Sequence, residues 1–286
     1  QEKASSAFDM VVQVKPGAWD SAGNTPVYVG GLVGSGAVYY AEARNVLVDN
    51  PDGRYTGGIA GNANIYYSRV SSDQEDAVIP KTRIRSSMGA GGVAGIGYGS
   101  NLTADGIEGE ATQNCAGGIV GSANSTLSQC TVDRIQVTAA VGAGGVAGEV
   151  LNSINSSLVA RSHITASAYN AGGLAGQIRT SVPNLENNGV IFTEVKAETG
   201  NTDTGAGNAG GLLGYGAHIG LCAVNYTKDV TVWTEGDYAG GLVGYGAGGS
   251  YERCYTDAKV EGRYGVGGFI GGLEASQRQV SSSYQD

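Results

Sequence analysis

The stretch Gly240–Ala247 reads GGLVGYGA, and thirty residues earlier Gly210–Ala217 reads GGLLGYGA. A glycine inside a regular element costs about 0.5–1 kcal/mol relative to alanine, because it loses more backbone freedom on folding. A repeated phrase this rich in glycine is therefore expected only where the backbone requires the missing side chains.

The phrase belongs to a longer series of two glycines, two apolar residues and a third glycine. Nine copies begin at Gly30, Gly57, Gly91, Gly117, Gly144, Gly172, Gly210, Gly240 and Gly267. Five of the eight intervals are 26–28 residues, and the other three are 30, 34 and 38. A period of this length is typical of a solenoid or repeat array.

The rest of each unit has the character of short strands. After the phrase comes a turn rich in Gly, Asn and Ser, and the unit closes on an alternating run such as RNVLVDN (44–50), DRIQVTA (133–139) or DVTVWTE (229–235). Alternation with β-branched residues predicts half-buried strands. No stretch carries the i, i+3, i+4 pattern of an amphipathic helix over three turns. The sequence predicts an all-β protein.

Two or three strands per 27 residues predict a right-handed parallel β-helix of about nine coils of about 27 residues. Coils stacked at about 4.8 Å make a column roughly 40 Å long, and only stacking buries the apolar ladders. A β-propeller blade needs about 40 residues. Glycine is expected to serve both positive φ at corners and close backbone approach. The sequence leaves open which face of the double-glycine strand points inward, because each of its two alternating sets of residues contains small or apolar side chains.

The chain is predicted to be a single domain overall. Residues 1–29 form an N-terminal strand or cap, with AFDMVVQVK (Ala7–Lys15) as the strand, and residues 30–286 form the repeat. Solenoids need such caps at their exposed ends.

The repeat resembles a known one. The stretch Gly240–Gly271 is similar to the GLUG motif of bacterial surface proteins, adhesin-like proteins and the non-catalytic parts of IgA-specific metallopeptidases. Tyr251, Cys254, Tyr255 and Val266 match its steps, whereas Arg253 stands where Asn is usual. The resemblance covers about residues 30–271 and implies a secreted bacterial scaffold with an adhesive role, without shared catalytic residues.

Composition limits the partners. The net charge is −9, which argues against nucleic acid or an anionic membrane as partner. There is no run of 18 apolar residues, so no membrane-spanning segment is expected. The chain begins at Gln1, and any export signal is expected to have been removed. The expected location, extracellular or the bacterial cell surface, is implied by the resemblance.

The four cysteines are Cys115, Cys130, Cys222 and Cys254. The last three lie 13, 12 and 14 residues after their double glycines, which predicts one shared rung of buried thiols. Cys222 and Cys254 are then neighbours, and a disulfide between them is left open. There is no Cys-x-x-Cys and no cluster of His, so no metal site is predicted.

Tyrosine gives the main candidate for a binding surface. There are 16 Tyr against 3 Phe, which favours an aromatic that works at a wet surface. Residues of equal phase, that is, at about the same distance from the double glycine of their own unit, are expected to stack on adjacent coils. Tyr39 and Tyr40 are therefore expected to stack on Tyr66 and Tyr67, and Tyr215 on Tyr245. Three further tyrosines each lie two residues before a double glycine: Tyr28, Tyr55 and Tyr238. Such ladders can bind the flat faces of sugar rings; the alternative is that they stabilise the coil rim.

A second candidate is the cationic strand face of Lys81, Arg83 and Arg85, which can hold sulfate or a sialic-acid carboxylate on a glycan. The alternative is a solvated face neutralised by the acidic loop before it. That loop contains Asp73, Glu75 and Asp76, hard oxygen ligands of the kind that calcium takes, but a solvated loop is favoured.

Two units are lengthened by insertions. The insertion of the second unit includes Ser71–Ser87, and the excess of the sixth is spread through SVPNLENNGVIF (181–192) and Glu198–Asn208. Solenoid insertions often leave from one binding face, so these are expected to flank a groove, or else to be tolerated surface loops.

The predicted function is a non-catalytic, adhesin-like module that binds host or matrix glycans or proteins, without a cofactor and with no catalytic residues. Self-association through a flat glycine-rich face stays open. His163 and His218 are the only histidines, and no His-Glu-x-x-His motif exists. Two alternatives remain: a structural stalk that spaces another domain from the cell surface, and a β-helical polysaccharide lyase or glycoside hydrolase, which needs paired carboxylates beside a cation.

Overall fold

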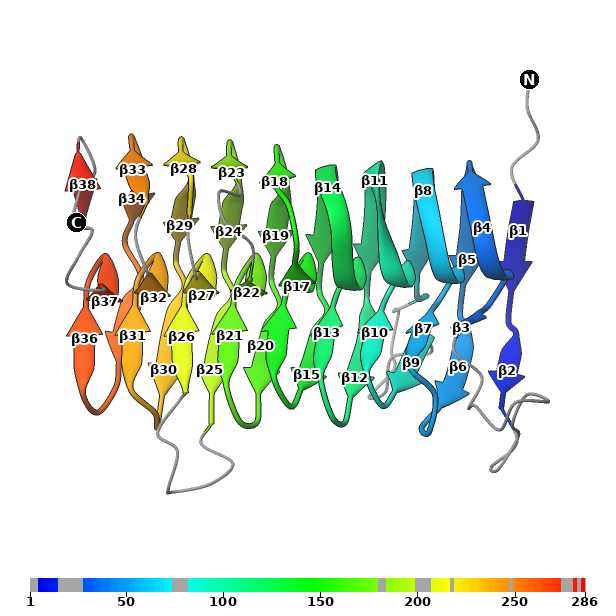
Figure 1. Ribbon diagram of the computed structural model, residues 1–286. Helices are drawn as coiled ribbons and strands as arrows, with labels where there is room; N and C mark the ends of the chain where they lie inside the picture. The colour runs from blue at the N-terminus through cyan, green and yellow to red at the C-terminus, as the bar shows by residue number, and fades with distance from the viewer. Residues whose placement is uncertain are drawn as a thin grey trace.

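The computed structural model describes residues 5–14, 28–73, 82–179, 184–198, 207–216, 219–246, 249–273, 280–281 and 284–285. The chain winds into a column of stacked coils, a parallel β-helix, with the two termini at opposite ends (Figure 1). All strand pairs within the described residues are parallel and join one coil to the next. The predicted fold class is confirmed.

Three sheets run along the column. Sheet C carries the residues up to the first glycine of each phrase: β3 (Tyr28–Gly30), β7 (Tyr55–Gly57), β10 (Gly89–Gly91), β13 (Cys115–Gly117), β16 (Gly142–Gly144), β21 (Asn170–Gly172), β26 (Asn208–Gly210), β31 (Tyr238–Gly240) and β36 (Gly265–Gly267). Sheet B carries the alternating runs: β2 (Val11–Gln13), β6 (Leu47–Asn50), β9 (Thr82–Ser86), β12 (Ile107–Ala111), β15 (Gln136–Ala139), β20 (His163–Ala166), β25 (Glu194–Ala197), β30 (Thr231–Thr234) and β35 (Lys259–Glu261).

Sheet A is the longest and begins at the second apolar residue of each phrase. In three coils it is one continuous strand, β8 (Ala60–Ser71), β11 (Ala94–Asp105) or β14 (Val120–Asp133). Elsewhere it is divided into shorter strands: β1 (Ser5–Phe8), β4 (Val33–Tyr39), β5 (Ala41–Arg44), β17 (Ala147–Val150), β18 (Ile154–Asn155), β19 (Leu158–Ala160), β22 (Ala175–Ile178), β23 (Asn184–Glu186), β24 (Gly189–Ile191), β27 (Leu213–Gly216), β28 (Leu221–Ala223), β29 (Tyr226–Lys228), β32 (Val243–Gly246), β33 (Ser250–Glu252), β34 (Tyr255–Thr256), β37 (Ile270–Leu273), β38 (Val280–Ser281) and β39 (Tyr284–Gln285).

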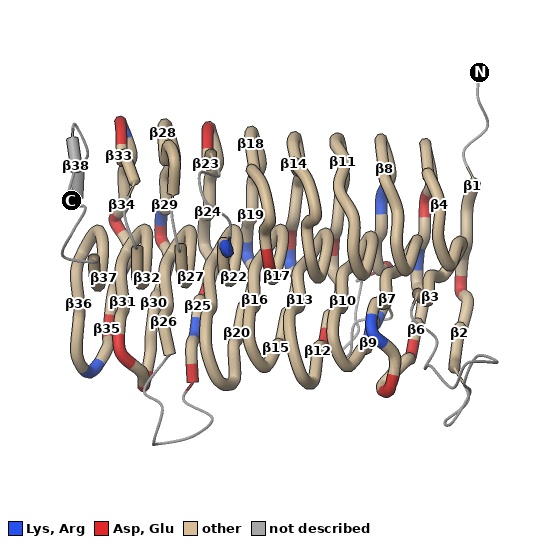
Figure 2. The backbone as a smooth tube through the Cα atoms, viewed as in Figure 1, with Lys and Arg blue, Asp and Glu red and all other residues tan. Residues whose placement is uncertain are grey.

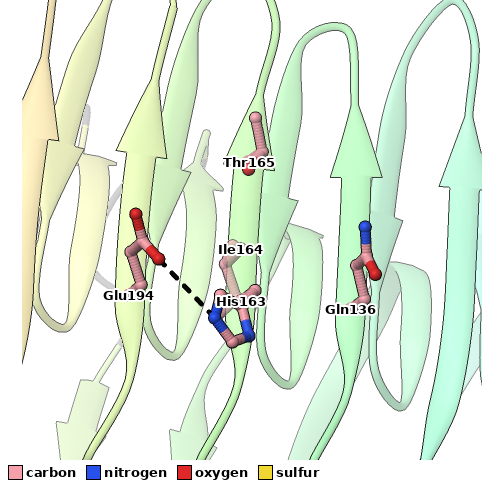
Figure 3. Close-up of a pocket in the computed structure, with 5 residues that line it drawn as sticks. All are labelled: Gln136, His163, Ile164, Thr165 and Glu194. Carbon is pink, nitrogen blue, oxygen red and sulfur yellow. Dashed lines mark ion pairs between the residues drawn. The ribbon is translucent and has the colours of Figure 1, made fainter. Parts of the chain in front are cut away.

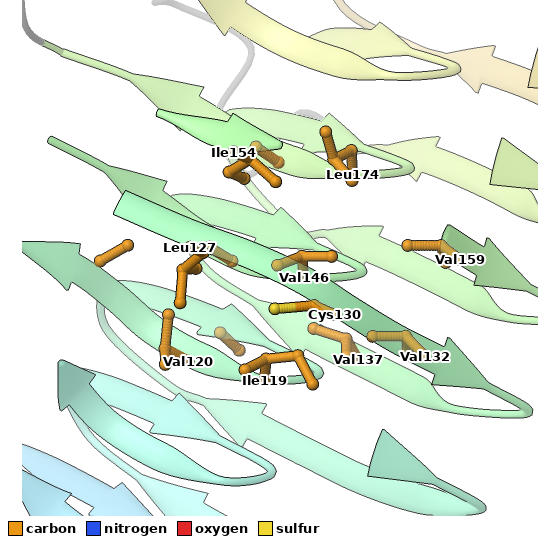
Figure 4. Close-up of a cluster of buried hydrophobic side chains, with 14 of the residues drawn as sticks. Ile119, Val120, Leu127, Cys130, Val132, Val137, Val146, Ile154, Val159 and Leu174 are labelled. Atoms are coloured by element: carbon orange, nitrogen blue, oxygen red, sulfur yellow. The ribbon is translucent and has the colours of Figure 1, made fainter. Parts of the chain in front are cut away.

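The repeated phrase forms the sharp bend between sheets C and A. The first apolar residues stack as a ladder, which includes Ile119, Val146 and Leu174 in Figure 4. Backbone hydrogen bonds hold that ladder, for example from Val146 N to Leu174 O at 2.8 Å. The second apolar residues, such as Val120 and Val243, are buried as well. Both apolar residues of the phrase therefore face the core, which decides the question left open by the sequence.

The three glycines are required by close approach of the backbone. A Cβ on Gly244 would lie 2.6 Å from the carbonyl oxygen of Gly214 and 2.8 Å from that of Ala209. A Cβ on Gly240 would lie 2.6 Å from Gly271 N, and one on Gly241 would collide with the carbonyl oxygen of Gly268. The bend brings sheets C and A so close together that no side chain fits between them.

The expectation that the phrase glycines supply positive φ at corners is wrong. Corners with left-handed backbone lie elsewhere in the coil and are filled almost entirely by other residue types. The corner within sheet A holds Tyr40, Tyr67, Asn101, Gln129, Ser156, Asn187, Val224 and Arg253, and the corner between sheets A and B holds Asp9, Asn45, Gly106, Arg134, Arg161, Phe192 and Asp229.

Buried polar side chains line the inside of the first corner. Asn188 donates from Nδ2 to the carbonyl of Ile154 at 2.9 Å and to Asn225 Oδ1 at 3.0 Å, and its own Oδ1 accepts from Ser157 N at 3.0 Å. Asn225 donates in turn to the carbonyl of Leu185 at 2.7 Å. This asparagine ladder satisfies the backbone groups that the turn leaves unpaired.

The predicted N-terminal strand is present as two strands. β1 pairs with β5 and β2 with β6, and the chain turns between them at Asp9, whose φ is 50°. The N-terminal segment thus follows the same path as the coils after it.

No helix in the described part of the chain has the length and apolar character needed to span a bilayer.

Candidate functional site

Four tyrosines form a stacked cluster at the corner within sheet A. Tyr39 lies over Tyr66 with ring centroids 5.2 Å apart and planes 15° apart, and Tyr40 lies over Tyr67 at 5.1 Å and 12°. Tyr39, Tyr40 and Tyr67 are 57%, 42% and 53% exposed. We call these four residues the tyrosine quartet.

Local structure explains the quartet. Tyr39 ends β4 in register with Tyr66 of β8, so their side chains leave the sheet on the same side. Tyr40 and Tyr67 follow in the left-handed conformation, with φ of 54° and 52°, and this turns their rings outward beside the first pair. Burial raises the pKa of Tyr66, and the neighbouring Tyr98 and Tyr39 raise it further, so its hydroxyl remains a neutral donor.

The second predicted pair has a different setting. Tyr215 stacks on Tyr245 at 5.9 Å and 6°, as the phase predicts, but Tyr238 of sheet C also contacts Tyr245 at 4.9 Å. The three rings are half-buried. A Cβ on Gly272 would meet the rings of Tyr238 and Tyr245, the nearest atom of Tyr245 at 2.9 Å. These rings thus fill space over neighbouring glycine positions. Tyr28 likewise stacks on Tyr55 at 5.9 Å.

The predicted cationic face is compensated by acids of the next coil. Arg83 contacts Glu108 and Glu110, each at 3.3 Å, and Arg85 contacts Glu110 at 3.4 Å. Lys81 lies outside the described residues. The two described arginines therefore present a mixed surface, and Figure 2 shows acidic and basic residues interspersed along the column.

Carboxylates and arginines also alternate along the corner between sheets A and B. Asp105 accepts from Arg134 at 2.7 Å and lies 3.4 Å from Arg69, while Asp133 pairs with Arg161 and lies 3.6 Å from Arg134. This chain of ion pairs has the paired acids and neighbouring cation that the enzyme alternative needs. Every member, however, is engaged with an oppositely charged neighbour.

A shallow pocket of about 280 Å³ lies on the outer face of sheet B (Figure 3). Gln136, His163, Thr165 and Glu194 line it from three adjacent coils, and His163 Nε2 lies 3.6 Å from a carboxylate oxygen of Glu194. These groups can accept and donate hydrogen bonds to a polar ligand. Sequence reasoning missed this pocket, although the outward position of His163 in the alternating run SHITASA was available as a signal.

The inserted segments do not leave from one side of the coil. The first begins after Asp73, where sheet A gives way to sheet B, and the second begins after Glu198, where sheet B gives way to sheet C. The expectation that they flank one groove is therefore not met by their described ends. Glu75 and Asp76, from the calcium hypothesis, lie outside the described residues.

Asp73, the described member of that hypothesis, accepts a hydrogen bond from Asn45 Nδ2 at 2.9 Å and lies 3.6 Å from Arg44. No group of three metal-binding side chains occurs within the described ranges.

The prediction of one shared cysteine rung is wrong. Cys222 is in register with Leu185 and Tyr251, two positions before the corner. Cys130 and Cys254 each directly follow a left-handed corner residue, Gln129 and Arg253. The varying offsets of 12 to 14 residues come from turns of different length. All four cysteines are buried free thiols.

Comparison with known proteins gives no relative. No protein-family model matches the chain, and neither a curated protein nor a solved structure resembles it at a significant level.

Proposed function

We propose that this β-helix is a non-catalytic binding module that holds an uncharged, extended polysaccharide against its tyrosine quartet. The observation that carries the proposal is the quartet itself, two parallel stacks on adjacent coils in which three of the four rings are exposed. The GLUG resemblance and the surface or extracellular location belong to the same proposal and rest on the repeated phrase alone.

The chemistry of the rings suits a sugar polymer. A tyrosine offers a flat apolar face to the C–H groups of a pyranose and a hydroxyl to the sugar hydroxyls, and two χ angles make it a rigid contact. Within each stack the two rings cover one another's facing sides, so a sugar meets the outer face of a stack and the ring edges and hydroxyls beside it.

Charge favours an uncharged chain over an anionic one. The protein carries a net charge of −9, which repels polyanions at long range. The described arginines of the predicted anion site already pair with Glu108 and Glu110. A sulfated or sialylated glycan would have to displace those carboxylates.

A panel of mucins, matrix glycans and neutral plant polysaccharides tests the proposal, with retention on the immobilised protein and polymer chain length both followed. Retention of a neutral polysaccharide without shortening is expected. Shortening would replace the proposal with the lyase or hydrolase alternative. Absence of retention across the panel would favour the stalk.

A further inference from the structure

Two of the buried cysteines lie against each other between adjacent coils near the C-terminal end of the column. The Sγ atoms of Cys222 and Cys254 are 3.9 Å apart, and Cys254 Sγ lies 3.2 Å from the carbonyl oxygen of Cys222. The two side chains are 0% and 1% exposed. Cys222 belongs to β28, and Cys254 directly precedes β34 on the following coil.

Neighbouring groups make this pair chemically different from the other two thiols. Asn225 donates from Nδ2 to Cys222 Sγ at 3.2 Å. The hydrogen bond between the two thiols lowers the pKa of Cys254, against the effect of burial, and raises that of Cys222, so Cys254 is the more readily ionised of the two. By contrast, burial raises the pKa of Cys115 and of Cys130 to about 12. The thiolate is the reactive form. Within the described part of the chain, the thiols of Cys115 and Cys130 form hydrogen bonds with asparagine, glutamine and serine residues and with no second thiol.

We infer that Cys222 and Cys254 form an oxidation site, which a small peroxide converts into a disulfide that fastens two adjacent coils together. The sulfurs must close from 3.9 Å to about 2.0 Å for the bond to form. End coils of a solenoid open more readily than central ones, because a terminal coil has a neighbour on one side only. That opening gives the peroxide access.

The reaction balances in two steps. The Cys254 thiolate attacks one oxygen of hydrogen peroxide, the O–O bond breaks, and the departing hydroxide takes up a proton to give water and a sulfenic acid. Cys222 sulfur then attacks the sulfenic sulfur, the S–O bond breaks, and hydroxide leaves as a second water with the proton of the Cys222 thiol. Two thiols are oxidised, and one peroxide is reduced to two waters.

The test uses the reduced full chain, treated with one equivalent of hydrogen peroxide, denatured, alkylated and digested with trypsin. Cleavage after Lys196, Lys228, Arg253 and Lys259 places Cys222 on peptide 197–228 and Cys254 on peptide 254–259. Cys115 and Cys130 share peptide 86–134 and serve as internal controls. The expected product is a linked pair of peptides 197–228 and 254–259, two hydrogens lighter than their sum, with peptide 86–134 alkylated twice.

Two further readouts keep the inference testable. The melting temperature of the oxidised wild type is expected to rise by several degrees and to return on reduction, since the link closes a long loop in the unfolded chain. The Cys254→Ala variant must abolish the linked product, whereas Cys130→Ala must leave it. Thiols at Cys222 and Cys254 that stay unreacted, or equal oxidation of all four cysteines, would overturn the inference.

Discussion

At the residue scale, the structure explains why the glycines of the phrase recur. They allow neighbouring backbone segments to approach where a Cβ would collide. None of them has a left-handed φ, and the left-handed positions are occupied by residues such as tyrosine, asparagine and even valine. The sequence predicted the close approach correctly, because the cost of so many glycines demanded a physical reason. It could not place the corners, because residues such as Tyr40 and Val224 give no turn signal.

The Gly241→Ala variant tests the requirement for space. An added Cβ collides with the carbonyl oxygen of Gly268 and lies 2.7 Å from Thr256 Oγ1, so we expect a loss of about 1–3 kcal/mol in the free energy of unfolding. The matched control is Gly109→Ala, where the nearest atoms would be 4.0 Å away and the change should be neutral or stabilising. Equal stability of the two variants, measured by denaturant titration, would refute the explanation.

The Val224→Asn variant tests the cost of the left-handed corners. Val224 has a φ of 54° and is 40% exposed, so it bears backbone strain without core packing in return. Asparagine occupies the same corner at Asn101 and Asn187. We expect stabilisation by about 1 kcal/mol, measured as a higher melting temperature. Val11→Asn, in the exposed strand β2, should give no increase, and a fall for Val224→Asn would count against the strain.

At the scale of the element, the three sheets differ in how far the sequence predicted them. The alternating runs were recognised and form sheet B, as in DRIQVTA, whose Val137 is buried between outward Gln136 and Thr138. Sheet A was harder to predict, since its strands break at corners that differ in length between coils. That variation also defeated the prediction of one cysteine rung.

The asparagine ladder is an element-scale feature whose loss should be costly. Replacing Asn188 by Leu removes the partners of Ser157 N and of the Ile154 carbonyl inside the column. We expect a loss of about 2–4 kcal/mol, because buried backbone groups would be left unpaired. Asn184→Leu on the same coil, where the side chain is half-exposed, should change stability by less than about 0.5 kcal/mol. Similar losses for the two variants, in denaturant titrations, would contradict the role of the ladder.

At the scale of the whole molecule, repetition predicted the column and left its surface undetermined. Equal phase correctly placed Tyr39 over Tyr66 and Tyr215 over Tyr245, since coils repeat almost in register. It could not predict that Glu108 and Glu110 neutralise the arginines, or that His163 meets Glu194. Such contacts depend on single side chains in neighbouring coils, which no period specifies.

Stacking also predicts a gradient of local stability along the column. Central strands such as β14 and β17 have coils on both sides, whereas β36 is the last described strand of its sheet. We expect slower amide hydrogen exchange at Val120 and Ala147 than at Val266, because each coil is stabilised mainly by its neighbours. Uniform exchange along the chain, followed by mass spectrometry, would indicate a single all-or-none unit instead.

The central claim is that the tyrosine quartet binds a polysaccharide through its aromatic rings, and a binding titration of the retained polymer tests it most directly. The wild type is compared with Tyr39→Ala/Tyr66→Ala, with Tyr39→Phe/Tyr66→Phe, and with Phe192→Ala, which removes a ring 58% exposed elsewhere on the surface. We predict a loss of affinity of about tenfold or more for the alanine pair, with most affinity kept by the phenylalanine pair and all of it by Phe192→Ala. Unchanged affinity in the alanine pair would contradict the account.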